Sequence, residues 1–169
     1  MNTIFLLLII FQLKHYICDY PLQNEYMLGK FKEKGWVLPL LSHALVHAKF
    51  TMIIVLLFNE SFTKALGLGL LDLTLHFIMD RIKASPKLLG KYKSMTKEQY
   101  VGSLERVDKL KKQSEVIRTS DMTNMYIKAL NEHKQLKKSN SMFWNSLGVD
   151  QMVHHLTHYI LIYLIVGVL

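Results

Sequence analysis

The sequence predicts an all-α protein: a polytopic membrane protein whose four transmembrane helices form a bundle. Half of its 169 residues are hydrophobic, and the mean hydropathy is +0.16. The apolar residues gather into four long runs instead of recurring at amphipathic spacing, which is typical of helices surrounded by lipid. A polar, lysine-rich segment separates the third run from the fourth. At this length we expect a single membrane domain over residues 1–169.

The four predicted helices follow in order along the chain. The first covers about residues 3–20 and lacks the basic start and small-residue cleavage site of a secretion signal, so we expect it to be retained. The second covers 37–58, with Pro39 in its first turn, where proline is tolerated. The third and fourth cover about 65–82 and 143–169. Each is long enough to cross about 30 Å of hydrocarbon at about 1.5 Å per residue.

The segment 83–141 is basic and is expected to be partly helical. Counted from Arg81, it holds 15 lysines and arginines against 6 aspartates and glutamates, a net charge of 15 − 6 = +9. Because positively charged loops stay in the cytoplasm, we expect this segment there and both termini on the external face. Its apolar residues recur at helical spacing with a break near 119–121, where Ser120 or Asp121 would cap a second helix.

The excess of lysine also bears on partners. It predicts contact with anionic membrane lipid, to which each lysine near the surface contributes about 1 kcal/mol. Nucleic acid is not an expected partner, because no aromatic stacking pattern or recognised motif accompanies the charge. The single cysteine, Cys18, excludes an internal disulfide and a cysteine-based zinc site. Oligomerisation is left open.

Each of the four predicted helices carries two metal-ligating side chains four residues apart. Positions i and i+4 of a helix lie on one face, about 6 Å apart, so each pair can hold one ion or two neighbouring ions. In lipid such side chains are costly unless they are coordinated or paired. With the basic segment in the cytoplasm, all four pairs fall near the cytoplasmic ends of their helices and share one depth. The expected ligands of a common metal centre are His15, Asp19, His43, His47, His76, Asp80, Asp150 and His154.

Other polar residues receive different predictions. His155 lies about 100° off the ligand face of its helix and is expected to be a packing residue. His158 and Asp72 extend the ligand faces, and they can be either ligands or neighbours of ligands. His133, in the basic segment, is expected to be solvated. A proton-relay cluster without metal is the alternative interpretation of the whole set.

Four motifs of the chain, HYICDYPLQ, HALVH, HFIMDRIK and DQMVH, resemble in order and spacing a small bacterial and phage membrane family. This family is known as domain of unknown function 3307. Its pattern is His-x3-Asp-x2-Leu-Gln, His-x3-His, His-x3-Asp-x2-Lys and Asp-Gln-x2-His, and the resemblance covers all four predicted helices. It implies an integral protein of the bacterial inner membrane. Beyond the eight ligand candidates, it marks Gln23, Lys83 and Gln151.

Eight imidazole and carboxylate side chains suit one or two divalent ions, with zinc as the expected metal and iron or manganese as alternatives. Two ions about 4 Å apart can activate water and clamp a phosphoryl or acyl group. Lys83 or Arg81 would neutralise the developing charge, and Gln23 and Gln151 would orient ligands or substrate. A substrate at the cytoplasmic leaflet is amphiphilic. The sequence therefore predicts a metal-dependent hydrolase acting on a lipid-like phosphoester or ester.

Three other functions stay open. HALVH is a His-x3-His box, and HHLTH resembles a reversed version of the His-x2-His-His box of membrane di-iron desaturases and hydroxylases, although the chain is short for such an enzyme and mixes aspartates with the histidines. A metal or proton transporter also places ionisable groups inside helices, although the almost wholly apolar external halves of these helices argue against a path to both faces. A structural metal centre with no exchangeable water would only brace the bundle of a non-enzymatic protein.

Overall fold

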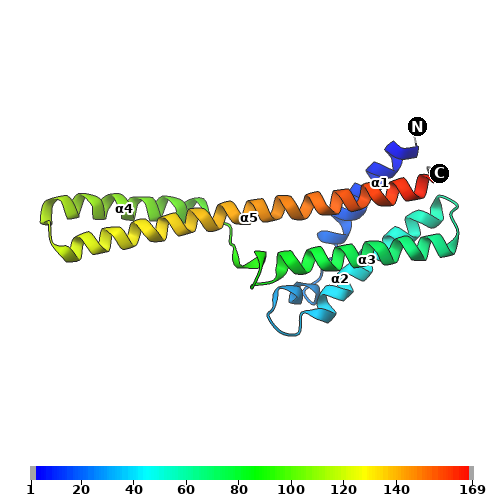
Figure 1. Ribbon diagram of the computed structural model, residues 1–169, viewed down its shortest axis with the longest axis horizontal. Coiled ribbons are helices and arrows are strands. Elements are labelled where there is room, and N and C mark those ends of the chain that lie inside the picture. Colours follow the sequence, from blue (N-terminus) through cyan, green and yellow to red (C-terminus); the bar gives the residue numbers. More distant parts are fainter. Residues whose placement is uncertain (1–2, 168–169) are drawn as a thin grey trace. The chain divides into compact units, whose positions relative to one another are not determined.

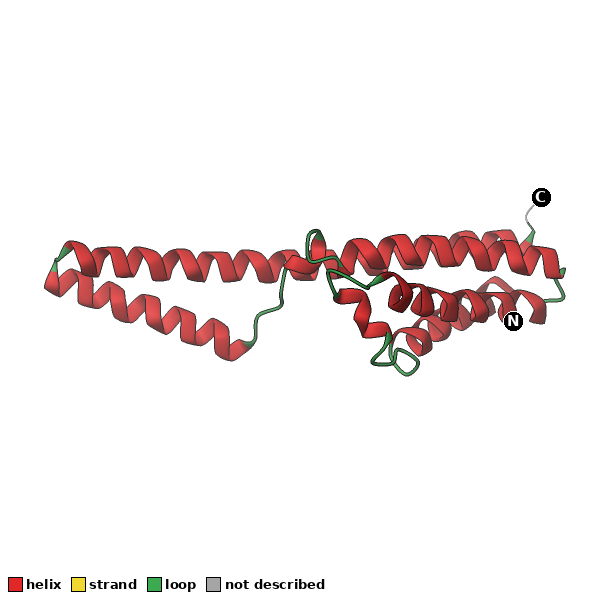
Figure 2. Cartoon of the chain, turned by 90° about the horizontal axis from the view of Figure 1, so that it is seen from below, coloured by secondary structure: helices red, strands yellow, loops and turns green. Residues whose placement is uncertain are grey.

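The computed structural model describes residues 3–167, and these are predominantly helical. Helix accounts for 83% of the chain, and Figure 2 shows no strand among the described residues. The all-α prediction is thereby confirmed. The chain divides into two compact units, one formed by Met1–Lys91 with Leu147–Leu169 and the other by Tyr92–Ser146.

The first unit contains three complete helices and the last part of another. Its elements are α1 (Thr3–Asp19), η1 (Met27–Phe31), α2 (Val37–Leu57), α3 (Phe62–Ala84), η2 (Leu89–Lys91) and the last part of α5 (Ser120–Val166). The helices α2 and α3 pack side by side (Figure 1). A short 3-10 turn follows α1, and another follows α3. The bounds of α1, α2 and α3 lie within three residues of those predicted.

An apolar core fills one half of this unit, and polar side chains gather in the other half. The core residues precede the polar residues in α1 and α3 and follow them in α2 and α5. Apolar residues of the four helices therefore lie beside one another, and so do the polar residues. The core is built from Leu7, Phe11, Ile54, Val55, Ala65, Leu68, Leu161, Ile162 and Ile165. Close packing of these side chains holds the four helices together through van der Waals contacts.

Helix α5 begins at Ser120, far earlier than the predicted start of the fourth helix at residue 143. The residues between these positions include neither glycine nor proline, the two residues that most often end a helix. They also pack against a neighbouring helix, α4 (Lys97–Ile117), through a small core of Val107, Leu110 and Ala129. The polar composition of this stretch therefore does not interrupt the helix.

The two helices of the second unit have well-defined ends. At the start of α4, Gln99 N donates to Thr96 Oγ1 over 3.2 Å and Thr96 N donates to Gln99 Oε1 over 3.0 Å, which is a capping box. The helix ends at Arg118, whose φ of 47° is left-handed. The predicted break near residues 119–121 is present. The cap differs from the prediction, because Thr119 Oγ1 accepts the N–H of Met122, over 3.4 Å.

His133 is buried in the second unit, so the prediction that it is solvated is wrong. Only 8% of the residue is exposed. Its Nδ1 lies 2.8 Å from Ser103 Oγ, and its ring packs against Tyr100 at 5.6 Å between centroids. Both partners belong to α4, which covers this face of α5. The imidazole is therefore a hydrogen-bonded packing residue.

Among the described residues 3–167, two helices, α2 and α3, are long and apolar enough to cross a membrane. With 17 residues, α1 would span about 26 Å, slightly less than the roughly 30 Å of a hydrocarbon core. The last part of α5 is apolar but carries three histidines, His154, His155 and His158, which lower its hydropathy. Length and composition thus indicate two candidate spans.

Candidate metal centre

All eight predicted ligands meet in the polar half of the first unit. Each of α1, α2, α3 and the last part of α5 supplies one i, i+4 pair, which is why four separate helices can reach one point. The side chains are deeply buried: seven of the eight are at most 7% exposed, and Asp19 is 19% exposed. The structure therefore brings the predicted set together completely.

Asp19 lies among four of the imidazoles. Its Oδ1 is 3.0 Å from His47 Nε2 and 3.4 Å from His43 Nε2. The same oxygen is 4.0 Å from His76 Nε2, while Oδ2 is 3.2 Å from His15 Nε2. One carboxylate from the end of α1 is thus in reach of imidazoles from α1, α2 and α3.

Asp80 and Asp150 extend the cluster toward α5. Asp80 Oδ2 lies 3.2 Å from His43 Nε2, and Asp80 Oδ1 lies 3.4 Å from His154 Nε2. Asp150 Oδ1 lies 3.3 Å from His154 Nε2. His43 therefore sits between Asp19 and Asp80, and His154 sits between Asp80 and Asp150. Imidazoles and carboxylates alternate through one continuous cluster.

These separations fit the coordination sphere of a metal. Two ligand atoms that each lie about 2.1 Å from one tetrahedral ion are about 3.4 Å apart. The distances from Asp19, Asp80 and Asp150 to their nearest imidazoles are 3.0–3.4 Å. A hydrogen-bonded packing cluster would also bring such atoms close, so the orientation of the nitrogens is the second test.

Several ring nitrogens in the cluster have no hydrogen-bond partner among the described residues. Nε2 of His15, of His43 and of His76 is buried and forms no hydrogen bond, although each lies within 4.0 Å of a carboxylate oxygen. His43 Nε2 lies within 3.4 Å of two carboxylates without forming a hydrogen bond to either. Burying a polar atom without a partner is costly, and coordination of a metal would satisfy each of these lone pairs. The residues present therefore fit a divalent ion.

Three overlapping groups of side chains can each hold an ion. In each group the ligand atoms lie within 4.8 Å of one another: His15, Asp19, His47 and His76; His43, His76 and Asp80; and Asp80, Asp150 and His154. His76 belongs to the first two groups and Asp80 to the last two. The three groups are therefore joined into one continuous set of candidate ligands.

Two lysines contact the carboxylates of the cluster. Lys83 Nζ donates to Asp150 Oδ2 over 2.5 Å, and Lys30 Nζ donates to Asp80 Oδ2 over 2.7 Å. Lys83 was expected near the centre. Lys30 was not, because it stands in the short turn η1 and its partner is 50 residues away in the sequence. Both ammonium groups offset the negative charge of the ligand set.

A polar pocket of about 130 Å³ opens onto the cluster, and we call it the mouth. It is lined by Asp19, Tyr20, Gln23, Lys30, Phe31, Asp80, Lys83, Ala84, Leu147 and Gln151. Gln23, Lys83 and Gln151, which we expected to act beside the metal, are all among these residues. Gln151 Nε2 also donates to Asp150 Oδ2 over 3.1 Å. The mouth thus joins two ligand carboxylates with two cations and two amides.

A second polar layer lies one helical turn beyond the ligands, toward the apolar core. Lys14 Nζ donates to Asp72 Oδ2 over 2.5 Å, and Thr51 Oγ1 donates to the same oxygen over 2.6 Å. Asp72 is therefore an ion-pair partner and belongs to none of the three ligand groups. His158 belongs to none of them either; its ring packs against Phe11 and His15, each at 5.3 Å between centroids.

We expect Asp72→Asn to lower the free energy of unfolding by about 3–5 kcal/mol, because it leaves the Lys14 ammonium buried without a counter-charge. The two side chains are 0% and 1% exposed. Denaturation of the purified protein by SDS measures the change. The double variant Lys14→Met with Asp72→Leu should recover most of the loss, since it removes both charges. Equal destabilisation by both variants would show that the ion pair is not the cause.

The chain matches the family described as Protein of unknown function (DUF3307) over residues 6–105, which is more than half of its length. It belongs to this family. The match covers most of α1 and all of α2 and α3, and with them six of the eight candidate ligands; Asp150 and His154 lie beyond it. The resemblance seen in the motifs is thus confirmed. The description of the family assigns no activity to it. No curated protein and no solved structure matches the chain.

Proposed function

We propose that this protein is a membrane-embedded, metal-dependent hydrolase that cleaves a lipid-like phosphoester or ester at the cytoplasmic leaflet. One observation carries the proposal: five imidazoles and three carboxylates from four apolar helices converge beneath a mouth that also holds two lysines. Hydrolysis of such a substrate needs an activated water, a clamp on the attacked oxygen and a cation to meet the developing negative charge. The cluster and its mouth supply residues for each task.

Zinc is the metal we propose, as one or two ions held by the three overlapping groups, in which His76 joins the first two groups and Asp80 joins the last two. Imidazole and carboxylate ligands without thiolate suit zinc, and they also suit iron and manganese. A divalent ion, when bound, polarises the substrate oxygen and makes a nucleophile of water at neutral pH. The two oxygens of Asp80 face different imidazoles, His43 and His154, so Asp80 would help to hold an ion together with either of them.

The residues of the mouth have separate roles in this proposal. Lys83 and Lys30 hold positive charge beside Asp150 and Asp80, where an anionic group of the substrate would enter. Gln151, which donates to Asp150, would orient that ligand, and Gln23 would donate to the substrate. A mouth of about 130 Å³ is smaller than the roughly 300–1,000 Å³ of typical ligand pockets. It suits the headgroup of a lipid whose remaining part lies outside the mouth.

The proposed membrane location is supported by the surface of the first unit. Its helices expose large apolar side chains, as helices in contact with lipid do. Examples are Phe5, Leu13, Ile53, Leu57, Phe62, Leu70, Ile78, Leu156 and Ile160, each at least 49% exposed. We propose that α1, α2, α3 and the last part of α5 all cross the bacterial inner membrane. The +9 segment then lies in the cytoplasm and both termini outside.

This topology is open to a direct labelling experiment. In a Cys18→Ser background, Ser114→Cys should resist an impermeant maleimide in intact cells and react after the cells are lysed, because the basic segment is retained in the cytoplasm. A cysteine introduced at Glu60, in the loop between α2 and α3, should react in intact cells. Labelling of Ser114→Cys in intact cells would show that the orientation is reversed.

A transporter is less well supported than an enzyme. The polar side chains extend one turn beyond the ligands, to Lys14, Asp72 and His158. There the apolar core begins, and all four helices contribute residues to it. A conducting path through one subunit would need polar groups on that side as well. The mouth, by contrast, gives the cluster an opening on the proposed cytoplasmic side.

The decisive experiment is elemental analysis of the protein purified in detergent. We expect stoichiometric transition metal, chiefly zinc, because eight candidate ligands converge and several of their buried nitrogens form no hydrogen bond among the described residues. His47→Ala should lose metal, while His133→Ala, a buried histidine of the second unit, should retain it. Folded, active protein with no metal above background would refute the proposal. Iron in place of zinc, with oxidation of lipid in the presence of oxygen, would favour the di-iron alternative.

A further inference from the structure

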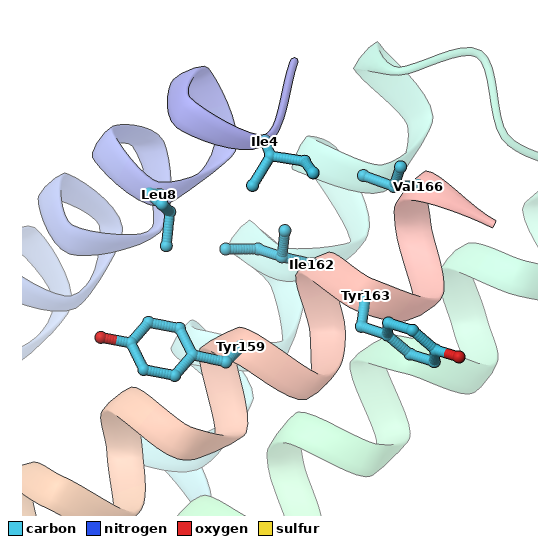
Figure 3. A pocket seen from close by; sticks show the side chains of 6 residues that line it. All are labelled: Ile4, Leu8, Tyr159, Ile162, Tyr163 and Val166. Carbon is cyan, nitrogen blue, oxygen red and sulfur yellow. The ribbon is translucent and has the colours of Figure 1, made fainter. Parts of the chain in front are cut away.

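The mouth and an apolar groove open at opposite ends of α1. The groove, of about 250 Å³, lies between the start of α1 and the end of α5, and Figure 3 shows that no charged side chain is among those that line it. Its walls include Ile4 of α1 and Val166 of α5. The mouth instead reaches Asp19, the last residue of α1, and Asp80, both of them candidate ligands. A polar substrate therefore reaches the cluster through the mouth, and the charge around the mouth helps to select that substrate.

Two ammonium groups at the mouth keep hydrogen-bonding capacity for a substrate. An ammonium has three N–H donors. Among the described residues, Lys30 Nζ donates to one acceptor, Asp80 Oδ2 over 2.7 Å, and Lys83 Nζ donates to one, Asp150 Oδ2 over 2.5 Å. Two further N–H groups on each lysine can therefore donate to a molecule in the mouth. Gln23 also lines the mouth, and its amide adds a neutral donor.

The Lys30 ammonium is held in place before any substrate binds. Lys30 is 7% exposed, and it belongs to the short turn η1. Arg81 Nη1 donates to the backbone oxygen of Lys30 over 3.5 Å, and the Arg81 guanidinium lies 3.8 Å from the centre of the Trp36 ring. Gly29 packs so closely on Pro39 that an added Cβ atom would come within 2.9 Å of Pro39 Cγ. A cation fixed in this way stabilises negative charge without reorganising during the reaction.

The charges around the cluster favour a substrate with two negative charges. Asp19, Asp80 and Asp150 carry −3 when ionised, and Lys30 and Lys83 carry +2. Two divalent ions would add +4 and a hydroxide nucleophile −1, so the site would hold a net charge of about +2. Uncompensated charge in a buried site is costly. A substrate with two negative charges would leave the site neutral.

We propose that the substrate is the phosphomonoester of a lipid alcohol, with its terminal phosphate in the mouth. This inference rests on the proposed function, because it names the substrate class of the same site. At neutral pH a phosphomonoester carries about −1.5 to −2, whereas a phosphodiester carries a single negative charge and a carboxylic ester carries none. Water attacks the phosphorus, the bond from phosphorus to the alcohol oxygen breaks, and that oxygen takes a proton from the water. The products are inorganic phosphate and the lipid alcohol.

The acceptors of a phosphate and the size of the mouth agree with this substrate. A terminal phosphate presents three oxygens beside the ester oxygen, and the remaining N–H groups of Lys30 and Lys83 can donate to them. A carboxylic ester presents one carbonyl oxygen, which would leave most of these donors without an acceptor. The mouth, at about 130 Å³, has the space of about four water molecules of roughly 30 Å³ each, which suits a phosphate with four oxygens. The lipid chain then remains outside the mouth.

Three matched substrates test the proposal on the full-length protein, purified in detergent with its metal. They are dodecyl phosphate, dodecyl methyl phosphate and dodecyl acetate. All three share one chain and can release dodecanol, so one mass-spectrometric assay measures them. We expect kcat/KM for dodecyl phosphate to exceed the values for the other two by about 10²-fold or more, because each of the others lacks at least one charge that the lysines meet.

The outcomes separate this inference from the proposed function. Hydrolysis of dodecyl methyl phosphate or dodecyl acetate as fast as that of dodecyl phosphate would refute the substrate class and leave the hydrolase intact. Hydrolysis of none of the three would overturn this inference together with the proposed function.

Binding of inorganic phosphate provides a measurement that is independent of turnover. Phosphate should bind the protein with its metal, and Lys30→Met should weaken this binding about 10- to 100-fold, because it removes a charged donor. Lys30→Arg, which keeps the charge, should retain most of the binding. Lys34→Met, which changes an exposed lysine between η1 and α2, is the matched control and should bind phosphate as the native protein does. Calorimetry at equal metal content measures the binding. If Lys30→Met binds phosphate as tightly as the native protein, the proposal is overturned.

Discussion

Asp80→Asn is expected to abolish metal-dependent turnover and to remove most of the bound metal. Asp80 is the one carboxylate shared by two of the three ligand groups, and its two oxygens lie 3.2 and 3.4 Å from His43 and His154. An amide keeps the size of the side chain but loses the negative charge and one of the two acceptors. The substitution therefore weakens both ligand groups to which Asp80 belongs. Metal content by elemental analysis, and release of product from a lipid phosphoester or ester, measure the effect.

His154→Ala should also abolish turnover and remove bound metal, because it removes an imidazole of the third ligand group. The Nε2 atom of His154 lies between Asp80 and Asp150. The matched control is Asp108→Asn, an exposed acid of α4, which should change neither quantity. Circular dichroism confirms that each variant is folded. Full metal content in both Asp80→Asn and His154→Ala would contradict the ligand assignment. Loss of metal with turnover preserved would instead contradict the role of the metal in the reaction.

The convergence of the eight candidate ligands was predictable from sequence because each pair is defined by local spacing. Each pair, such as His43 with His47, is an i, i+4 pair on one apolar helix. Burying such groups in lipid is costly, so each pair is expected to bind an ion or another polar group. The helix directions then follow from the loops, which places the four pairs at one depth. Nothing in this inference requires a contact between residues distant in the sequence.

The lysines could not be found in the same way. Lys14 and Asp72 are 58 residues apart, and Lys30 and Asp80 are 50 residues apart. Each looks like an isolated charge until the helices pack, because a buried ion pair leaves no periodic signal in either segment. The early start of α5 was missed for a similar reason: its polar residues suit a helix only because α4 covers their apolar side.

Lys83→Ala is expected to lower turnover by about 10²-fold while leaving the metal content unchanged. Its ammonium lies 2.5 Å from Asp150 Oδ2, whereas His154 approaches the other oxygen, Oδ1. The side chain of Lys83 is 32% exposed at the mouth. It can therefore offset charge that develops on the substrate without being needed to hold an ion. Loss of one preorganised charge-stabilising group typically costs about 10²–10³ in rate.

The measurement separates this role from a structural one. Turnover and metal content are determined together for Lys83→Ala and for Lys87→Ala, an exposed lysine four residues further along the chain that should affect neither. The ion bound by the third ligand group should compensate the Asp150 carboxylate once Lys83 is gone, so metal is retained. If Lys83→Ala loses metal as readily as His154→Ala, the ammonium is holding the ligand in place, and its assignment to charge stabilisation is wrong.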